Sequence, residues 1–318
     1  MNQVREFRTQ TAADPRSTAE LIRLALAAPD DDAAWKFVAI LHSRCDHEVL
    51  DAARGLCFSE LAPERKLGAH ILGQIGAPGA GFPDAVFDCL ANLLRRESDE
   101  EVLAAIAFAL GHLDDPRCLD MLLSLKGHPS AGVRFGVVNG ISGQSHPAAV
   151  QTLVELSRDE DRETRDWATF GLGTFIDTDS EEIREALAAR LGDEVEEIRN
   201  EALVGLARRR DPRALPPLLV ALSGAEPSAM HIEAAMALGD AALLPSLMAI
   251  KHRREDHFSA EAEWLDKAID SCLKGRERGN EGTREQGNEG TRERGNEGTR
   301  ERGNEGTRER GNEGTRGQ

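Results

Sequence analysis

One pattern of about a dozen residues occurs six times in this chain and constrains its fold more than any other feature. Each copy centres on a small anchor residue, and the steps between successive anchors are 38, 31, 31, 34 and 32 residues. The anchors are Gly73, Gly111, Ser142, Gly173, Ala207 and Gly239. A period of this length is typical of stacked repeats, in which each unit packs only against its neighbours.

The columns around the anchor predict a pair of helices in each unit. The residue before the anchor is always a large aliphatic, the residue two before it is small in five of six copies, and the residue eight before it is arginine in four. The apolar columns lie on one stripe of a helix. Proline stands five residues after the anchor in four copies, twice preceded by aspartate, which indicates the start of a further helix. We therefore predict an all-α chain, an α-α superhelix built from helical hairpins.

Three stretches carry a family resemblance: "EVLAAIAFALGHLDDPRCLDMLLSL", "RDWATFGLG" and "EIRNEALVGLARRRDPRALPPLLVAL". They resemble HEAT repeats, and specifically the short bacterial units labelled phycobilisome-lyase-like. The resemblance covers roughly residues 62–253 and implies an armadillo-like helical solenoid. We expect an irregular helical N-terminal cap at 1–61 and the HEAT-like array at 62–274. The array is expected to end in a helix whose Trp264 and Leu265 cover the last hairpin.

Residues 275–318 differ in character from the rest of the chain. The motif "GNEGTR" recurs every eight residues, with ten arginines, ten glutamates and almost nothing apolar to bury. Such a composition predicts a disordered tail. Two interpretations remain open: an expanded DNA repeat that is incidental to function, or an arginine-glycine tail that contacts RNA. The balance of charge and the lack of aromatic residues favour the first.

The formal charge of -17 falls on the rest of the chain, because the tail is neutral. An acidic surface repels nucleic acid and anionic membranes. One local cluster of arginines, at 208–210 and 213, is interpreted as a solvated hairpin turn. There is no apolar stretch long enough to span a bilayer, and the five scattered cysteines suit reduced thiols, so we expect a cytoplasmic protein without membrane partners.

The sequence predicts no catalytic residue, no metal and no cofactor. It shows no nucleophile beside a base and no glycine-rich phosphate loop. His47 and Glu48 form the sole adjacent His-Glu pair, whereas the di-iron site of the related deoxyhypusine hydroxylase uses several such pairs. His42, Cys45 and His47 have spacing suited to zinc but lack a second ligand pair. The resemblance keeps one enzymatic hypothesis open, a lyase or chaperone-like component acting on a protein-bound tetrapyrrole. A third hypothesis is a regulatory subunit that works through an acidic outer face.

The best candidate for a functional surface is a strip on the second helix of each hairpin, at seven and three residues before the anchor. It comprises Lys66, His70, Ala104, Phe108, Phe135, Asn139, Asp166, Phe170, Asn200 and Val204. Second helices usually line the concave wall of a helical solenoid, and aromatic rings among polar residues are typical of protein-binding hot spots. The alternative is that these rings fill space between hairpins.

We therefore predict a non-catalytic scaffold that binds a protein or peptide partner in its concave groove. The candidate contact residues are Phe108, Phe135, Asn139, Asp166, Trp167, Phe170 and Asn200. Arg134 and Arg165 are expected to pair with carboxylates of turns or helices rather than with a ligand.

Overall fold

The computed structural model describes residues 14–79, 81–224, 226–253 and 263–277, and within them every regular element is a helix. The chain divides into two compact units, Met1–Leu206 and Ala207–Gln318. Among the described residues, no helix is both long enough and apolar enough to cross a membrane. The predicted all-α repeat architecture is confirmed.

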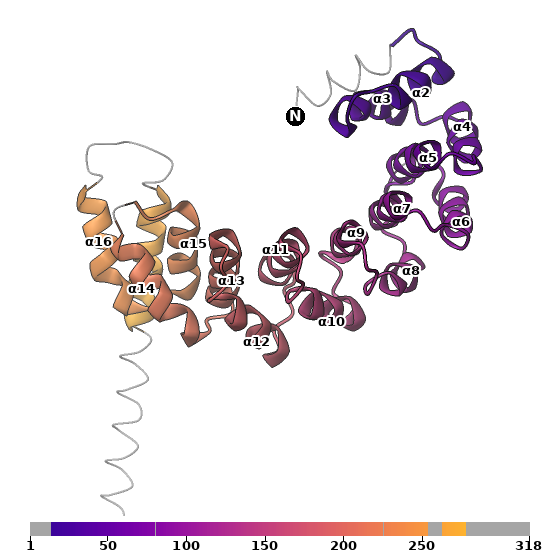
Figure 1. Ribbon diagram of the computed structural model, residues 1–318. Coiled ribbons are helices and arrows are strands. Elements are labelled where there is room, and N and C mark those ends of the chain that lie inside the picture. Colours follow the sequence, from indigo (N-terminus) through magenta and orange to yellow (C-terminus); the bar gives the residue numbers. More distant parts are fainter. Residues whose placement is uncertain (1–13, 80, 225, 254–262, 278–318) are drawn as a thin grey trace, which may run out of the picture. The chain divides into compact units, whose positions relative to one another are not determined.

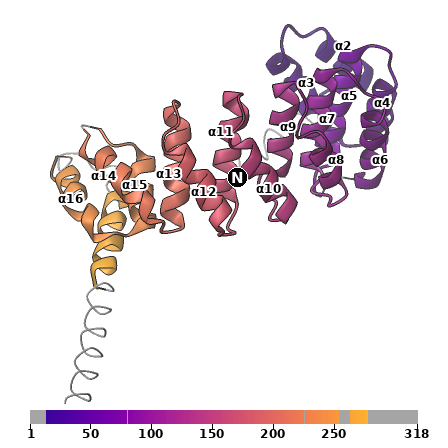
Figure 2. The same cartoon turned by 60° about the horizontal axis from the view of Figure 1, so that its bottom comes forward.

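The first unit is a row of helical hairpins. Its first helices are α2 (Thr18–Leu26), α4 (His47–Cys57), α6 (Pro83–Leu94), α8 (Cys118–Ser124), α10 (Pro147–Leu156) and α12 (Glu181–Arg190). Its second helices are α3 (Asp31–Arg44), α5 (Ala62–Ile75), α7 (Glu100–His112), α9 (Ala131–Ile141), α11 (Arg162–Phe170) and α13 (Glu196–Arg208). The last two residues of α13 belong to the second unit. Within this unit, α5, α7, α9 and α11 follow one another on the inner side of a curved row, and α4, α6, α8 and α10 form the outer side (Figure 1, Figure 2).

The second unit contains α14 (Leu215–Ser223), α15 (Ala229–Leu238) and α16 (Leu244–Arg253), and α14 packs against the other two. Residues 263–277 form a further helix, whose Ser271 hydroxyl donates to the carbonyl of Met236 at 2.8 Å. Leu265 is buried as expected, whereas Trp264 is 44% exposed. The start of the predicted closing segment, 258–262, and most of the predicted tail, 278–318, lie outside the described residues.

Close approach of the second helices explains the two small columns of the repeat. A Cβ atom added to Gly111 would collide with the Cα of Gly140, and one added to Gly73 would lie 2.8 Å from the Cα of Ala109. In both cases the anchor of one repeat meets the residue two before the anchor of the next. The large aliphatics preceding the anchors, from Leu72 to Leu206, are all buried beneath these contacts.

The predicted helix start at Asp-Pro is only partly correct. The Asp115 and Asp211 carboxylates accept hydrogen bonds from the backbone amides two residues on, those of Arg117 and Arg213, at 2.8 and 3.0 Å. These bonds close a tight turn, and Pro212 opens a 3-10 turn, Pro212–Ala214, rather than an α-helix. The α-helices therefore begin two or three residues after the prolines, at Cys118 and Leu215.

Candidate functional site

Five aromatic rings form a continuous row along the second helices of the first unit. Their members are Phe108, Phe135, Trp167, Phe170 and Phe175, and successive ring centroids lie 5.7, 6.1, 5.7 and 4.8 Å apart in edge-to-face contact. We call this set the aromatic row. Edge-to-face contact is the favourable geometry for aromatic side chains at these distances. The row thus extends without a break over three successive repeats, on α7, α9 and α11.

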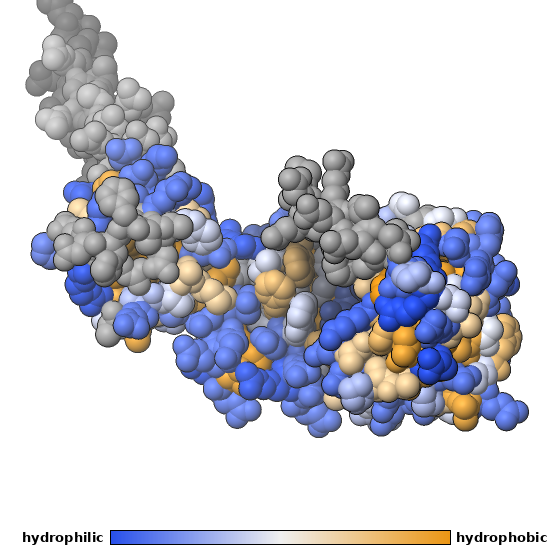
Figure 3. All heavy atoms as spheres, turned by 90° about the horizontal axis from the view of Figure 1, so that it is seen from above, coloured by the Kyte–Doolittle hydropathy of each residue, from blue (hydrophilic) through white to orange (hydrophobic). Residues whose placement is uncertain are grey.

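The aromatic row is open to solvent. Trp167 is 39% exposed and Phe175 is 47% exposed, while Phe108, Phe135 and Phe170 are half-buried. The face shown in Figure 3 is mostly hydrophilic, with smaller hydrophobic areas between the polar side chains. The exposed rings of the aromatic row retain surface that a partner could cover.

Phe175 is the member of the aromatic row that the sequence pattern missed. Helix α11 continues into a π-helical turn, Gly171–Phe175, closed by a hydrogen bond from Ile176 N to Gly171 O at 3.1 Å. The wider turn places Phe175 against Phe170, although Phe175 follows the anchor and lies outside the predicted strip. A phenylalanine two residues after the anchor was a visible signal, but its orientation depends on the π-turn.

The remaining residues of the predicted site differ in burial and in their position relative to the aromatic row. Asn139 is half-buried beside the row, and its side-chain amide donates to the carbonyl of Phe135 at 3.2 Å. Asp166 is half-buried too, and burial raises the pKa of its carboxyl. Asn200 lies half-buried on α13. Val204, which the strip also included, is 2% exposed and belongs to the core, so the strip ends before it.

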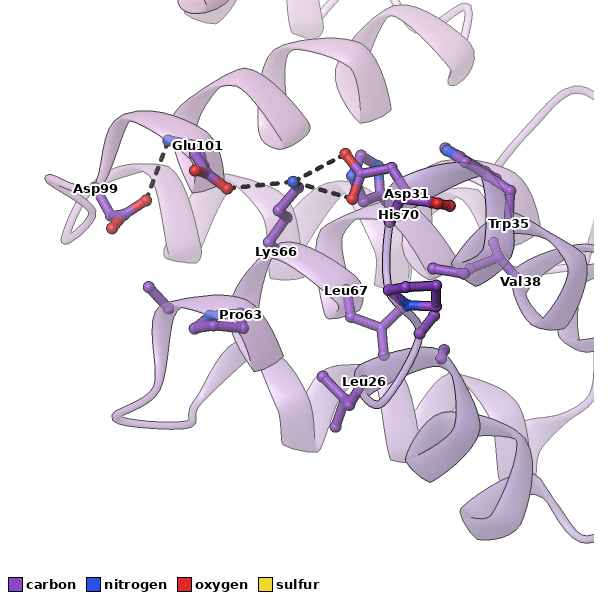
Figure 4. A pocket seen from close by; sticks show the side chains of 16 residues that line it. Leu26, Asp31, Trp35, Val38, Pro63, Lys66, Leu67, His70, Asp99 and Glu101 are labelled. Carbon is purple, nitrogen blue, oxygen red and sulfur yellow. Dashed lines mark hydrogen bonds and ion pairs between the residues drawn. The ribbon is translucent and has the colours of Figure 1, made fainter.

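A second feature of the same strip is a pocket of about 380 Å³ between α3, α5 and the start of α7 (Figure 4). We call it the acidic pocket. Its polar and aromatic lining comprises Asp30, Asp31, Trp35, Lys66, His70, Asp99 and Glu101. The Lys66 ammonium lies between two carboxylates, 3.1 Å from Asp31 Oδ2 and 3.2 Å from Glu101 Oε2. The rings of Trp35 and His70 are in tilted contact at 5.0 Å.

The charges of the acidic pocket do not cancel. Burial opposes ionisation of Lys66, but its hydrogen bonds to Asp31 and Glu101 outweigh that effect and raise its pKa. Burial lowers the pKa of His70 to about 4, with a smaller contribution from the Lys66 charge, so His70 is neutral at pH 7. The lining thus holds four carboxylates, of which two contact the one ammonium, and the excess of negative charge favours a cationic ligand group.

Possible metal ligands are dispersed among separate contacts. His42 Nδ1 lies 2.8 Å from the Gln74 carbonyl oxygen, Cys45 Sγ donates to the carbonyl of Ile75, and the His47 ring contacts that of Phe82. Over the part of the chain that the structure describes, there is no group of three or more His, Cys, Asp or Glu side chains placed to hold a metal ion. All five cysteines are free.

The prediction for Arg134 is confirmed. Its Nη1 donates to the carbonyls of His128 and Pro129, both at 2.9 Å. Its Nε and Nη2 pair with the carboxylate of Asp159 in the next repeat, both at 2.8 Å. Bidentate geometry of this kind gives the strongest arginine-carboxylate contacts. We call this arrangement an arginine clamp.

Arg165 forms the same clamp one repeat later, which confirms the second prediction. It donates to the carbonyls of Asp159 and Glu160 at 2.8 and 3.3 Å, and its Nε lies 3.0 Å from Asp193 Oδ2. The two arginines therefore have structural partners and are not available to a ligand.

Comparison with known proteins first shows the class of repeat in this chain. The family model for HEAT repeats matches residues 87–173 and 155–239. Together with the hairpin stack, this match shows that the chain contains HEAT repeats.

The chain is similar to Protein YibA of Escherichia coli strain K12, with 28% identity over 260 residues, 79% of this chain and 89% of YibA. The X-ray structure of YibA matches with a TM-score of 0.68 and 26% identity, over 83% of this chain and 94% of that one. An engineered protein shares the fold, with a TM-score of 0.50 and 17% identity over 79% of this chain and 77% of its own. The complex of CpcE and CpcF of phycocyanin lyase from Nostoc gives a TM-score of 0.42 at 17% identity, a likeness too distant to bear on activity.

Proposed function

We propose that this protein is a non-catalytic scaffold that binds an extended segment of a partner protein across the second helices of its first unit. Apolar side chains of the partner would cover the aromatic row, and a basic side chain would enter the acidic pocket. The observation that carries the proposal is the unbroken, solvent-open row of five rings over three successive repeats.

The exposed rings are not needed to stack the hairpins. The contacts between second helices are made by glycine and alanine, as at Gly111 and Gly140, and by the buried aliphatics next to the anchors. Rings that only filled space between hairpins would be buried, whereas Trp167 and Phe175 keep more than a third of their surface exposed. Large aromatic side chains at the centre of an interface contribute most of its binding energy.

The charge of the acidic pocket suggests the chemistry of the partner. Lys66 and His70, which line the pocket, stand at the same repeat offsets as Phe108 and Phe135 in the row. An extended chain crossing the second helices would therefore meet both surfaces. A net charge of -17 would also accelerate association with a basic partner.

The first experiment is an affinity capture with the full chain and two matched variants. Trp167→Ala removes one exposed ring from the row, and Trp264→Ala removes a comparably exposed ring from the helix at 263–277. Circular dichroism confirms equal helicity, and mass spectrometry identifies the captured proteins. We expect a specific partner that is lost with Trp167→Ala and retained with Trp264→Ala.

A quantitative measurement follows with peptides that tile the captured partner. The peptide that binds is expected to contain an apolar cluster and a basic residue, and its Kd should rise about tenfold or more with Trp167→Ala. Neutralising the pocket with Asp31→Asn and Glu101→Gln should weaken binding most at low ionic strength. Equal capture by all variants would contradict the proposal and would favour the acidic outer face.

A further inference from the structure

Successive arginine clamps are linked, because one acidic residue contacts the arginines of two clamps. We call this linked series the relay. The carboxylate of Asp159 closes the clamp of Arg134, and its backbone carbonyl accepts from Arg165 at 2.8 Å. Asp193 repeats this arrangement, with its carboxylate on Arg165 and its carbonyl accepting from Arg199 at 2.7 Å. In each case the acidic residue stands six positions before the next clamp arginine.

An earlier clamp follows the same rule. Arg65 donates to the carbonyls of Ser59 and Glu60, at 3.2 and 2.9 Å, and pairs with Glu97 of the next repeat at 2.7 Å. Glu97 stands six residues before position 103, where the following clamp arginine would be expected.

Position 103 is a leucine, and the clamp is missing at this repeat. The acidic residue that would close it, six positions before Arg134, is also replaced, by His128. The His128 imidazole accepts a hydrogen bond from Ser130 N at 3.1 Å. Both partners of the ion pair are therefore absent together, at one repeat in the middle of the relay.

The backbone acceptors of the missing clamp remain in place. In the neighbouring repeats the clamp arginine bonds the carbonyls five and six residues before it, which at this repeat are those of Ser98 and Glu97. Within the described residues, neither carbonyl receives a hydrogen bond from the protein. Because no protein group occupies them, both carbonyls are available to a donor group of a ligand.

An open cavity of about 770 Å³ occupies this position. Its apolar walls are Leu94, Leu103, Met121 and Leu125, from α6, α7 and the end of α8. Glu97, Ser98 and His128 line it on the side of the turns, and the exposed Asp120 belongs to the lining. Arg95 also lines it, with its guanidinium donating to Asn92 Oδ1.

We propose that this cavity binds an arginine side chain of a partner protein, in the place that the clamp arginine occupies in neighbouring repeats. The guanidinium would donate to the carbonyls of Glu97 and Ser98, as Arg134 donates to those of His128 and Pro129. The aliphatic stem would lie along Leu103 and Leu125, and Asp120 would supply the counter-charge. A planar guanidinium can donate to two adjacent acceptors at once, which an ammonium matches poorly.

The cavity is separate from the aromatic row, so the inference does not depend on the proposed function. It is lined mainly by the ends of the first helices α6 and α8 and the turns that follow them, whereas the row runs along the second helices α7, α9 and α11. The chain's acidic charge favours a basic ligand here too.

The test uses the full chain and N-acetyl-L-arginine amide as the probe. Binding is followed by NMR through the Met121 methyl group and the His128 ring, with N-acetyl-L-citrulline amide as an uncharged control of the same shape. The double variant Leu103→Arg, His128→Asp rebuilds the clamp and fills the cavity. We expect the arginine probe to shift both signals, the citrulline probe to bind about tenfold more weakly, and the double variant to lose the response.

Three results would overturn the proposal: no response of Met121 and His128 to the arginine probe, an equal response to citrulline, or an unchanged response of the Met121 methyl group in the double variant. If the double variant does not fold, Ser124→Trp is used in its place, because it puts a large ring at an exposed lining position.

A further experiment changes the arginines between 278 and 316 to glutamine. A response that appears only in that variant would assign the cavity to the chain's own arginines and contradict a partner.

Discussion

Arg134 Nε lies 2.8 Å from Asp159 Oδ2, and this contact joins two consecutive repeats through side chains that are only 10% and 6% exposed. The same guanidinium bonds two carbonyls of its own repeat. In a stack where each hairpin contacts only its neighbours, such a bond links one turn to the next. The clamp therefore supports the stacking that the apolar columns drive.

Removing a clamp is expected to cost much more than removing an exposed ion pair. Arg134→Ala leaves the Asp159 carboxylate buried without its main partner, which should lower the free energy of unfolding by about 3 to 5 kcal/mol. Arg162→Ala is the control, since Arg162 and Glu197 are 62% and 66% exposed and their pair should contribute less than about 1 kcal/mol. Urea denaturation followed by circular dichroism measures both. Similar losses in the two variants would argue against the clamp as a stabilising contact.

Added bulk at an anchor glycine is expected to separate the second helices. A Cβ on Gly111 would meet the backbone of Gly140, which cannot move without shifting a helix, so Gly111→Ala should destabilise by about 1 to 3 kcal/mol. Gly55→Ala is the matched control in helix α4, because a Cβ there meets nothing within 4 Å. Alanine at that exposed position should stabilise by about 0.5 to 1 kcal/mol. Thermal melts of the two variants should shift in opposite directions, and a stabilising Gly111→Ala would refute the observed helix contact.

Acid is expected to weaken the first unit through His70. Burial lowers the pKa of His70 to about 4 in the folded chain, while the unfolded histidine titrates near 6.5. Between these values the unfolded state binds more protons, so stability falls as the pH drops through this window and is unaffected by His70 above about pH 7. The effect amounts to about 1 to 3 kcal/mol by pH 4. Urea midpoints at pH 7.5, 6 and 5 should fall more steeply for the wild type than for His70→Gln, and parallel curves would contradict the buried neutral state.

Rebuilding the missing clamp is expected to stabilise the protein only when both residues are changed. Leu103→Arg alone provides a guanidinium without its carboxylate, and His128→Asp alone provides a carboxylate without its guanidinium. The double variant should exceed the sum of the single changes by about 1 to 3 kcal/mol, measured as a double-mutant cycle. Additive effects would mean that positions 103 and 128 do not face each other as Arg134 and Asp159 do.

Much of the fold could be predicted from the sequence because its signals are local and repeated. The aliphatics before the anchors predicted which helix face is buried, and Leu72 and Leu110 are indeed in the core. The offsets of Phe108 and Phe135 predicted one side of the second helices, and both rings are half-exposed there. These features depend on helical periodicity alone, which a chain expresses in its order of residues.

Other features depend on contacts between residues far apart in the chain. The division into two units after Leu206 falls inside α13, where no change in composition marks it. Phe175 joined the row through a π-turn, and Trp264 remained exposed although its pattern suggested burial. Turn geometry and the neighbouring surface decide such cases, and neither is encoded within a single repeat.

The sequence by itself determined the repeat, the helical hairpins, the buried stripes and the acidic charge, because each follows from residue type and spacing. Only the tertiary structure decided which residues of different repeats meet. It placed the anchor Gly111 against Gly140, joined Arg134 to Asp159, and opened a cavity where Leu103 and His128 replace that pair. The physical reason is that a contact across repeats depends on how closely two helices approach, and that distance is set by the packing of the whole stack.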